Sequence, residues 1–585
     1  MLAHPKIPLH PKLNRVSEAV RISLLVSSGM LAAVAQAQIP CPIYTALNVA
    51  DAQVNATTCN NYSELNILSP GGVLTNQYLA TLTNYPGSAL TNNQQLNNYG
   101  ILNNSGTTNN NSQLLNTRGA LNNLSGGSFT NTDVLYSYYG HIDNGGTFIN
   151  SGTINNLYSG ITNRSLGSIS NLSGGVINTY GLSISIEKDS TLSNYGQITH
   201  TGAIENNGII VNQSSGVIDM DCCAMLIYGQ INNYGTMNIT NTTTDSISGT
   251  LNNYTGGVFN NNIGSRFFTS NNSLVNNDGV FNNYAAFGNR GTLSNISNGS
   301  LTNAAQMYNS DGGEIINDGA FEIAYNGTLY GDGTGMFHQT GGSTIVDGVL
   351  SANMTGFTGG TLLGDGEIIS ANPVLIDVAA NVNPGRALAD DPVNYIGDLS
   401  VSADFHVEGT LSIEIASPAS FDLINIRGAA SFGNVSNIHF SIVDSYTPQD
   451  GDTITFLNAD GLTNLEDITF NMTGLPSNLT YEVYANQESD LVLRFNSTSS
   501  ISDLLDDLQE LVDNGTINAG KANGLSSHLY NAMRKLEREN TTQSCNQLQA
   551  FITVANAMTP NSLDPVIAAE LISSAESIQA SLGCM

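Results

Sequence analysis

Asp219 and Asp221 are the candidates for catalysis in this 585-residue sequence. They stand two residues apart, so on a strand both carboxylates project from one face. Paired carboxylates serve polysaccharide lyases and hydrolases, often with Ca²⁺ or a basic partner. The nearest basic residues, Lys188 and Arg266, are each more than thirty positions away. We therefore expect no catalytic residue; if the chain is an enzyme, Asp219 and Asp221 are its candidates.

Acidic turns raise the question of a bound cation. Several aspartates adjoin Gly or Pro, and the candidates for Ca²⁺ are Asp332, Asp365 and Asp452. Others of this kind are Asp390, Asp391, Asp398 and Asp450. Because EF-hand spacing and GGxGxD arrays are absent, ordinary turn hydrogen bonding is the preferred interpretation. We expect no cofactor, with Ca²⁺ left open.

Aromatic and charged side chains offer a binding chemistry. Sugar sites commonly use Trp, which is absent, but 23 tyrosines are present. The cluster of Tyr136, Tyr138 and Tyr139 could stack on sugars, but packing at solenoid corners or edges is the preferred interpretation. Residues 187–189 (Glu-Lys-Asp) form the densest charged spot of the repeat, for which a solvated face is the simpler interpretation.

The six cysteines indicate an oxidising compartment. We expect the disulfides Cys41–Cys59 and Cys545–Cys584, each stapling a terminal piece. Cys222 and Cys223 form either an adjacent pair within one coil or buried apolar corners of consecutive coils. Because no CxxC occurs, a zinc or redox site has little support.

The elements that carry these side chains come from one repeated phrase, an apolar residue, any residue, then Asn. It runs from about Leu65 to Phe321, as in Leu96-Asn97-Asn98 and Phe148-Ile149-Asn150. The apolar positions recur about every six to eight residues, which no helix allows. Apolar residue and Asn share one strand face, and Gly or Asn suits the corner that follows. Three such sides close a coil in roughly 20–22 residues, which predicts a solenoid rather than a disordered Asn/Gly tract.

Two consequences follow from stacking such coils. Each coil lies about 4.8 Å above the last, so the repeat holds about twelve coils over roughly 60 Å. An inward Asn at the same place in every coil can form a hydrogen-bonded amide ladder. These asparagines are therefore expected in the core and not at a binding surface.

The chain falls into five predicted segments. Four basic residues precede the apolar run 22–35, and Ala35-Gln36-Ala37 offers a cleavage site, as in an export signal. No later apolar stretch reaches transmembrane length. The segments are 1–37, signal peptide; 38–64, N-terminal cap; 65–390, parallel β-helix; 391–498, β-rich end; and 499–585, helical bundle.

The charge balance excludes one class of partner. The net charge is −31, and about −34 without the predicted signal. Only eight basic residues lie between positions 39 and 500, namely Arg118, Arg164, Lys188, Arg266, Arg290, Arg386, Arg427 and Arg494. Such a surface repels phosphate backbones, so we expect no nucleic-acid partner. Cations or neutral glycans fit better.

The region after the repeat resembles the ends of bacterial autotransporter and adhesin passenger domains. The motifs are Asn383-Pro384-Gly385, Gly397-Asp398-Leu399, Gly409–Ile415, Phe421–Gly428 and Gly451–Ile454. The resemblance implies a right-handed parallel β-helix displayed outside a bacterial cell, although the repeat alone leaves the hand open. No alternating strand series follows, so the family's translocator barrel is not expected. Longer strands over 395–497 predict either a small β-sandwich or an extended solenoid end.

The last 85 residues change to helical periodicity. Apolar stripes at Leu504 and Leu508, at Leu525 and Leu529, and over 548–555 and 567–578 predict four amphipathic helices. With the phrases around residues 515–529 and 547–552, this segment resembles the FIMAH domain of exported bacterial proteins. That resemblance implies an accessory module on a surface or extracellular protein.

Together these patterns predict a mainly β protein with a small all-α bundle. We expect an exported, non-enzymatic structural or adhesin protein at the outer surface of a bacterium or outside it. Its partner would be a glycan or protein of a host or neighbouring cell, and self-association is open. The alternatives are a polysaccharide lyase or glycoside hydrolase on the same scaffold, and a biofilm or surface-layer matrix component.

Overall fold

The computed structural model describes residues 36–584 except 244, 387–395, 477–478, 488, 498–499, 539 and 560–562. The predicted signal peptide therefore lies almost wholly outside the described residues, as do Asp390 and Asp391 and the junction predicted between them. The chain divides into two units, Met1–Asp219 and Met220–Met585. Together the units contain about 18 turns of β-solenoid, 51% strand, and four C-terminal helices, which confirms the predicted fold class.

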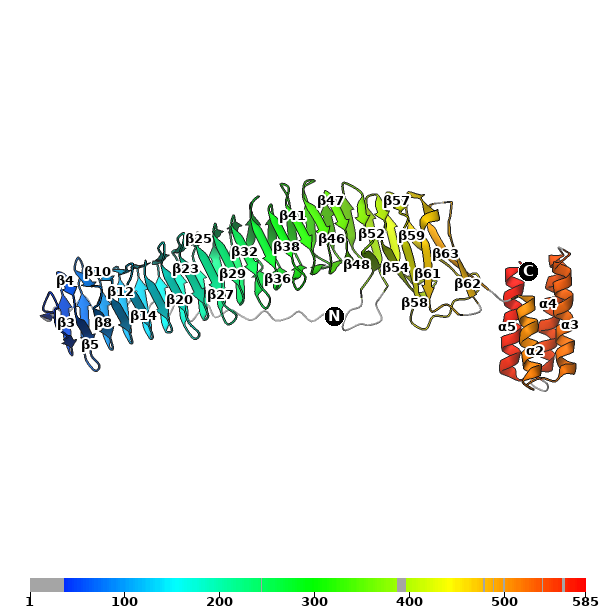
Figure 1. The fold of residues 1–585 in the computed structure, drawn as a ribbon, viewed down its shortest axis with the longest axis horizontal. Helices are drawn as coiled ribbons and strands as arrows, with labels where there is room; N and C mark the ends of the chain where they lie inside the picture. Colours follow the sequence, from blue (N-terminus) through cyan, green and yellow to red (C-terminus); the bar gives the residue numbers. More distant parts are fainter. Residues whose placement is uncertain are drawn as a thin grey trace, which may run out of the picture. The chain divides into compact units, whose positions relative to one another are not determined.

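Unit 1 is built of three parallel sheets, and from β3 onward each coil contributes one strand to each sheet. The strands stack along the solenoid (Figure 1). Sheet A holds β1 (Ala37–Gln38), β3 (Ala52–Asn55), β6 (Val73–Asn76), β9 (Gln95–Asn98), β12 (Gln113–Thr117), β15 (Val134–Tyr138), β18 (Thr153–Leu157), β21 (Val176–Tyr180) and β24 (Gln197–Thr201). Sheet B holds β4 (Thr58–Asn61), β7 (Thr81–Asn84), β10 (Ile101–Asn104), β13 (Ala120–Asn123), β16 (His141–Asn144), β19 (Gly160–Asn163), β22 (Ile184–Ile186) and β25 (Ile204–Asn206). Sheet C holds β2 (Leu47–Val49), β5 (Glu64–Ile67), β8 (Ala89–Asn92), β11 (Thr107–Asn110), β14 (Ser128–Asn131), β17 (Thr147–Asn150), β20 (Ser168–Asn171), β23 (Thr191–Asn194) and β26 (Ile209–Asn212). β27 (Val217–Cys223) contains the boundary between the units.

The register places like residues above one another. Leu82 pairs with Leu102, and Leu102 pairs with Leu121, so one coil takes about twenty residues here. Alternation along each strand buries the apolar residue and the Asn and turns the residue between them outward. Strands of the predicted N-terminal cap, such as β3 and β4, already pair with the next coil in the same way.

The inward asparagines form the predicted amide ladders. In each step the Nδ2 atom of one Asn donates to Oδ1 of the Asn one coil later, at 2.6–2.9 Å. The same Nδ2 atom commonly donates to a backbone carbonyl beyond the corner as well, as from Asn131 to Thr153. The ladders run through Asn55, Asn76, Asn98 and Asn116 in sheet A; Asn61, Asn84, Asn104, Asn123, Asn144 and Asn163 in sheet B; and Asn92, Asn110, Asn131, Asn150, Asn171, Asn194 and Asn212 in sheet C.

Unit 2 begins with coils of the same kind. Its ladders include Asn253, Asn277, Asn295 and Asn317, and later coils place apolar residues such as Ile323 and Val346 at the inward position. Its strands are β28 (Met225–Ile227), β29 (Gln230–Asn233), β30 (Thr236–Thr242), β31 (Asp245–Ile247), β32 (Thr250–Asn253), β33 (Val258–Asn261), β34 (Arg266–Thr269), β35 (Leu274–Asn277), β36 (Val280–Asn283), β37 (Ala286–Asn289), β38 (Thr292–Asn295), β39 (Ser300–Asn303), β40 (Gln306–Asn309), β41 (Glu314–Asn317), β42 (Ala320–Ile323), β43 (Thr328–Gly331), β44 (Met336–Gln339), β45 (Ser343–Val346), β46 (Val349–Ala352), β47 (Met354–Phe357), β48 (Gly360–Gly364), β49 (Glu367–Ser370), β50 (Val374–Ile376) and β51 (Ala380–Pro384).

The solenoid of unit 2 ends in longer strands. β54, β58 and β61 still pair in parallel, so this region is an extended solenoid end and not a separate sandwich. It finishes in an antiparallel hairpin of β62 and β63, whose second strand also pairs with β59. The elements are β52 (Asp398–Ser402), β53 (Phe405–Val407), β54 (Thr410–Ser417), β55 (Ser420–Phe421), β56 (Leu423–Ile426), β57 (Ala429–Phe432), β58 (Asn437–Ile442), β59 (Thr453–Asn458), β60 (Gly461–Thr463), the 3₁₀ helix η1 (Leu465–Asp467), β61 (Thr469–Thr473), β62 (Leu479–Ala485) and β63 (Leu491–Ser497).

The C-terminal segment forms a four-helix bundle (Figure 1). Ser500 caps the first helix in a capping box with Asp503. The predicted apolar stripes meet in one core, in which Leu508, Leu525 and Phe551 are fully buried. The helices are α2 (Ile501–Asp513), α3 (Ala519–Leu536), α4 (Thr541–Met558) and α5 (Pro565–Ser581).

Candidate functional site

The corner that follows sheet A in unit 1 departs from the repeat. Arg118, Tyr139 and Tyr158 occupy it in successive coils with positive φ angles of 55°, 49° and 51°. The left-handed conformation costs about 1–2 kcal/mol for a residue with a Cβ atom. Gly181, with φ 99°, fills the place one coil later at no such cost. Bulky residues in strained conformations are held there by their surroundings, which makes the corner a functional candidate.

Backbone bonds hold the corner in place. The amide of Arg118 donates to the carbonyl of Tyr138 at 2.9 Å, and that of Tyr139 donates to the carbonyl of Leu157 at 3.1 Å. The amide of Tyr158 donates to the carbonyl of Tyr180 at 2.7 Å. Each corner is thus clamped to the strand of the next coil, so its side chain projects from a rigid backbone.

Four tyrosines, Tyr138, Tyr139, Tyr158 and Tyr180, form a connected aromatic surface that we call the tyrosine corner. The rings of Tyr139 and Tyr158 stack with centroids 5.2 Å apart and an interplanar angle of 15°. Tyr138 meets Tyr139 edge-on at 4.6 Å, and Tyr180 meets Tyr158 edge-on at 5.8 Å. Tyr139, Tyr158 and Tyr180 remain 52%, 43% and 50% exposed, so the rings present edges and hydroxyl groups to solvent.

Arg118 supplies a positive charge at one end of the tyrosine corner. Partial burial raises the pKa of Tyr138, the neighbouring tyrosines add to the rise, and the charge of Arg118 opposes it. The guanidinium is exposed and forms no ion pair with any described residue. Tyrosine rings beside a guanidinium can contact the apolar faces and the hydroxyl groups of a sugar.

Beneath the tyrosine corner the amide ladder of sheet A is interrupted. Asn116 ends the run of asparagines, and Ser137, one coil later, bonds Ser159 at 2.8 Å between their hydroxyl oxygens. Asn156 donates only to the carbonyl of Ser159, at 2.6 Å. The interior therefore changes in the same coils in which the corner becomes aromatic.

The same inward column ends in unit 1 with a buried histidine. His200 is fully buried, and its Nδ1 atom is hydrogen bonded to Oγ1 of Thr179. Burial of the imidazole lowers the pKa of His200 to about 4, while the backbone groups of Ala203 and Gly202 act in the opposite direction. The neutral ring is therefore the form that the fold accepts at physiological pH.

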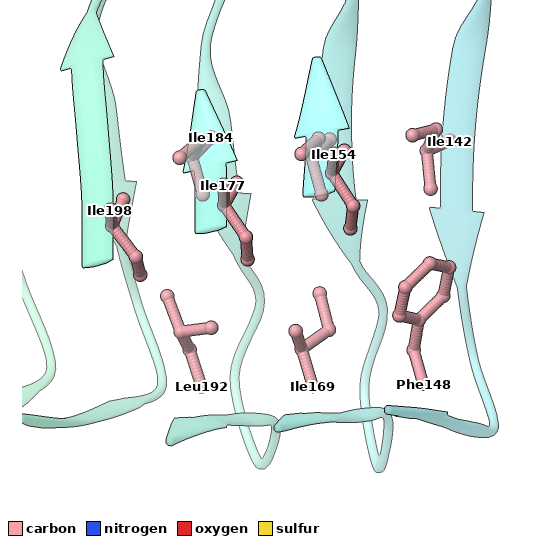
Figure 2. A pocket seen from close by; sticks show the side chains of 9 residues that line it. Ile142, Phe148, Ile154, Ile169, Ile177, Ile184, Leu192 and Ile198 are labelled. Atoms are coloured by element: carbon pink, nitrogen blue, oxygen red, sulfur yellow. The ribbon is translucent and has the colours of Figure 1, made fainter. Parts of the chain in front are cut away.

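Unit 1 also contains a small internal space of about 20 Å³ (Figure 2). It is lined only by apolar side chains from β16 to β24, and a space of this size holds no more than one water. We interpret it as a packing gap of the core. The lining residues are Ile142, Phe148, Ile154, Ile161, Ile169, Ile177, Ile184, Leu192 and Ile198.

The two aspartates singled out as catalytic candidates lie on β27, and each accepts a hydrogen bond from an amide. Asp219 accepts from Nε2 of Gln197 at 3.5 Å, and Asp221 accepts from Nδ2 of Asn241 at 2.9 Å. Asp221 forms no ion pair with a basic side chain among the described residues.

The calcium candidates are engaged in turns. The carboxylate of Asp332 accepts from Thr334 and from the amide of Asp311, and these bonds lower the pKa of Asp332. Asp452 accepts from the hydroxyl of Tyr446 at 2.6 Å. Asp365 is exposed. Within the described residues no group of three or more His, Cys, Asp or Glu side chains is arranged to hold a metal ion.

Three disulfides are present, Cys41–Cys59, Cys222–Cys223 and Cys545–Cys584. Cys222 and Cys223 pair with each other at the end of β27, where Cys222 is exposed and Cys223 is half-buried, so the alternative of buried corner residues does not hold. The third disulfide joins α4 to the residues after α5.

The charged spot at residues 187–189 is part of an outer ion-pair ladder. Arg164 bridges Asp143 at 2.7 Å and Glu187 at 3.0 Å. All three side chains are at the surface, so this arrangement fits the solvated face expected from the sequence. Exposed pairs of this kind contribute little stability.

Sequence reasoning found part of the tyrosine corner. Of the predicted cluster, Tyr138 and Tyr139 belong to it, whereas Tyr136 lies two residues earlier and takes part in none of its ring pairs. Tyr158 and Tyr180 were missed. Their signal was available, because they follow Tyr139 at spacings of about one coil.

Comparison with known proteins identifies one domain. A family model described as the FIMAH domain matches residues 501–580, which confirms the resemblance of the helical bundle. No curated protein matches the chain. The crystal structure of a TibC-catalyzed, hyper-glycosylated TibA fragment is similar at 16% identity over 64% of this chain and 97% of that one, with a TM-score of 0.20. At that TM-score the match supports no inference about function. In the described part of the chain no helix is long and apolar enough to cross a membrane.

Proposed function

We propose that the chain is an exported, non-enzymatic β-solenoid protein with an adhesin-like role at the outer surface of a bacterium, and that the tyrosine corner is its contact surface for a glycan. The FIMAH match supports a place among surface or extracellular proteins. We also propose that the solenoid is displayed outside the cell, as in the autotransporter passenger domains that the motifs of the solenoid end resemble.

One observation carries the proposal. Tyr139 and Tyr158 keep large side chains at a corner where glycine would be free of strain, and their rings stay about half exposed. Stacking between the two rings returns about 0.5–1.5 kcal/mol, which no more than offsets the backbone cost. Stability alone therefore gives little reason for tyrosine at both positions, whereas ligand contact does.

A glycan-array measurement tests the proposal. The double variant Tyr139→Gly/Tyr158→Gly should lose binding by at least tenfold relative to the wild type. The matched control is Tyr62→Ala/Tyr85→Ala, which removes a stacked pair (centroids 4.4 Å apart) at another corner of unit 1 without positive φ angles. If the control loses as much binding as the double variant, or if no glycan is bound, the proposal fails.

The enzymatic alternative places catalysis at Asp219 and Asp221. A screen for release of reducing or unsaturated sugars, with Asp219→Ala as the control, separates it from the proposal. Sugar release that the substitution abolishes would overturn the non-enzymatic assignment.

A matrix or surface-layer component is the other alternative, and it depends on self-association. Light scattering with and without a chelator tests it, because Ca²⁺ bound in acidic turns such as that of Asp332 would drive assembly. The proposal includes no cofactor, so scattering and glycan binding should be unchanged by chelation.

A further inference from the structure

The acidic side chains are distributed very unevenly between the two units. Residues 36–219 contain eight carboxylates and three basic side chains, whereas residues 220–585 contain 38 carboxylates and nine basic side chains. The strong net charge of the chain therefore belongs to unit 2. The total charge, which favours neutral or cationic partners, therefore does not describe the surface of unit 1.

The tyrosine corner lies in a stretch of sequence with little negative charge. Between Glu64 and Glu187, a stretch that contains Arg118 and all four tyrosines, the only acidic residues in the sequence are Asp133 and Asp143. Of the eight basic residues between positions 39 and 500, five form ion pairs with carboxylates, whereas Arg118, Lys188 and Arg266 form none among the described residues. Of these three, Arg118 shares its corner position with Tyr139 and Tyr158.

The geometry gives the corner a direction. The corner position is occupied in four successive coils by Arg118, Tyr139, Tyr158 and Gly181. With a rise of about 4.8 Å per coil, Arg118 lies about 14 Å from Gly181 along the solenoid axis of unit 1. The charge of Arg118 acts on Tyr138, whose ring meets Tyr139 edge-on at 4.6 Å and Tyr158 edge-on at 6.2 Å. A guanidinium presents a fork of donors that matches a carboxylate, while ring edges and hydroxyl groups suit the rest of a sugar chain.

We infer that the tyrosine corner recognises a carboxylated glycan, with the guanidinium of Arg118 pairing with a sugar carboxylate and Tyr139, Tyr158 and Tyr180 contacting the adjoining sugars. This inference rests on the proposed function, and it narrows the ligand class from glycans in general to polymers that contain uronic or similar acidic sugars.

The experiment uses three uronate polymers, polygalacturonate, alginate and hyaluronate, each alongside its methyl ester. Esterification removes the charge and keeps the chain, so the pair isolates the role of the carboxylate. Affinities of the full chain are measured at 0.15 M salt, where charges beyond about 8 Å are largely screened. We expect at least one polymer to bind at least tenfold more tightly than its ester.

Two charge variants test whether Arg118 causes the preference for the free acid over the ester. Arg118→Gln should lower the affinity for the free acid to that for the ester. Arg266→Gln, which removes another exposed arginine without an ion pair, should change it less than twofold. Both variants keep the backbone positions occupied by side chains of similar length, and unfolding midpoints verify that each folds.

The outcomes separate this inference from the proposed function. Equal binding of acid and ester that is lost in Tyr139→Gly/Tyr158→Gly overturns the carboxylate preference and leaves glycan binding standing. A preference that survives Arg118→Gln, or that Arg266→Gln removes equally, overturns the role of Arg118. Binding of neither form of any of the three polymers overturns the inference, and the glycan array then decides whether the proposed function falls with it.

Discussion

Two inward columns of unit 1 pass through the same coils and differ in their side chains. In sheet C the column is asparagine from Asn92 to Asn212, whereas in sheet A it changes after Asn116 to Ser137, Asn156, Thr179 and His200. The uniform column is followed by ordinary corners. The changed column underlies the tyrosine corner. The repeat thus specifies the scaffold, and the coils that depart from it are the candidates for a role beyond the scaffold, such as ligand binding.

The largest difference between the columns should appear in stability. Asn150 of sheet C makes four side-chain hydrogen bonds, to Asn131, Asn171, Gly152 and Val176, while Asn156 of sheet A makes one, and both are fully buried. Asn150→Ala leaves several buried groups unpaired and should cost about 4 kcal/mol.

The matched substitution in the other column is Asn156→Ala. It leaves fewer buried polar groups without a hydrogen bond and should lower the free energy of unfolding by about 1–2 kcal/mol. Urea midpoints of the two variants, measured together with the wild type, give the comparison. Equal losses would mean that the amide ladder is not what distinguishes the columns.

Acid should lower the stability of the coils around His200, the buried histidine of the sheet A column. The pKa of His200 falls from 6.5 to about 4 on folding, so the unfolded chain takes up a proton first as the pH drops. The stability from this group is full above pH 6.5 and is lost as the pH falls towards 4, on the order of 3 kcal/mol in all. His200→Asn, which puts the ladder residue in its place, should lose less than half as much over that range. Denaturation midpoints at pH 4, 5, 6 and 7 test this, and parallel curves for the two proteins would contradict it.

Unit 2 should respond to pH with the opposite sign. Asp422 is fully buried, and burial, with Glu414 as its hydrogen-bonded neighbour, raises the pKa of its carboxyl. The stability from a raised carboxyl is full below pH 3.8 and declines as the pH rises. Asp422→Asn mimics the protonated form, so its stability relative to wild type should increase from pH 5 to pH 9. Hydrogen exchange of the peptides that cover β54 and β56 measures this stability locally. If the ratio of the exchange rates of variant and wild type does not change with pH, the raised pKa of Asp422 is refuted.

Much of the fold can be predicted from the sequence because the same pattern of apolar residue and Asn recurs in coil after coil. Spacing and alternation predict coils, and the Asn at i+2 predicts the ladders, because amides buried at the same place in successive coils can hydrogen bond to one another. The helical bundle is equally local, because its stripes and caps lie within one short segment. The longer strands after residue 395 allowed two architectures, and only the parallel pairing of β54 with β58 distinguishes them.

The candidate site was harder to predict because it depends on the register between coils. Tyr138 and Tyr139 are adjacent in sequence and were noticed, but Tyr158 and Tyr180 join them only through stacking of the coils. The strain at Arg118, Tyr139 and Tyr158 is a backbone property that residue types do not reveal. The net charge of the whole chain was a poor guide to the partner of the tyrosine corner, because most of the negative charge lies in unit 2 and unit 1 is only weakly acidic.

The central claim is that ligand contact, and not stability, accounts for the tyrosine corner. The most direct test measures the affinity for the best-bound glycan and the urea midpoint on the same samples of wild type and Tyr139→Gly/Tyr158→Gly. Relief of backbone strain and loss of ring stacking nearly cancel, so we predict a stability within about 1 kcal/mol of wild type and an affinity at least tenfold lower. A variant that is destabilised by several kcal/mol, or that keeps its affinity, would contradict the account.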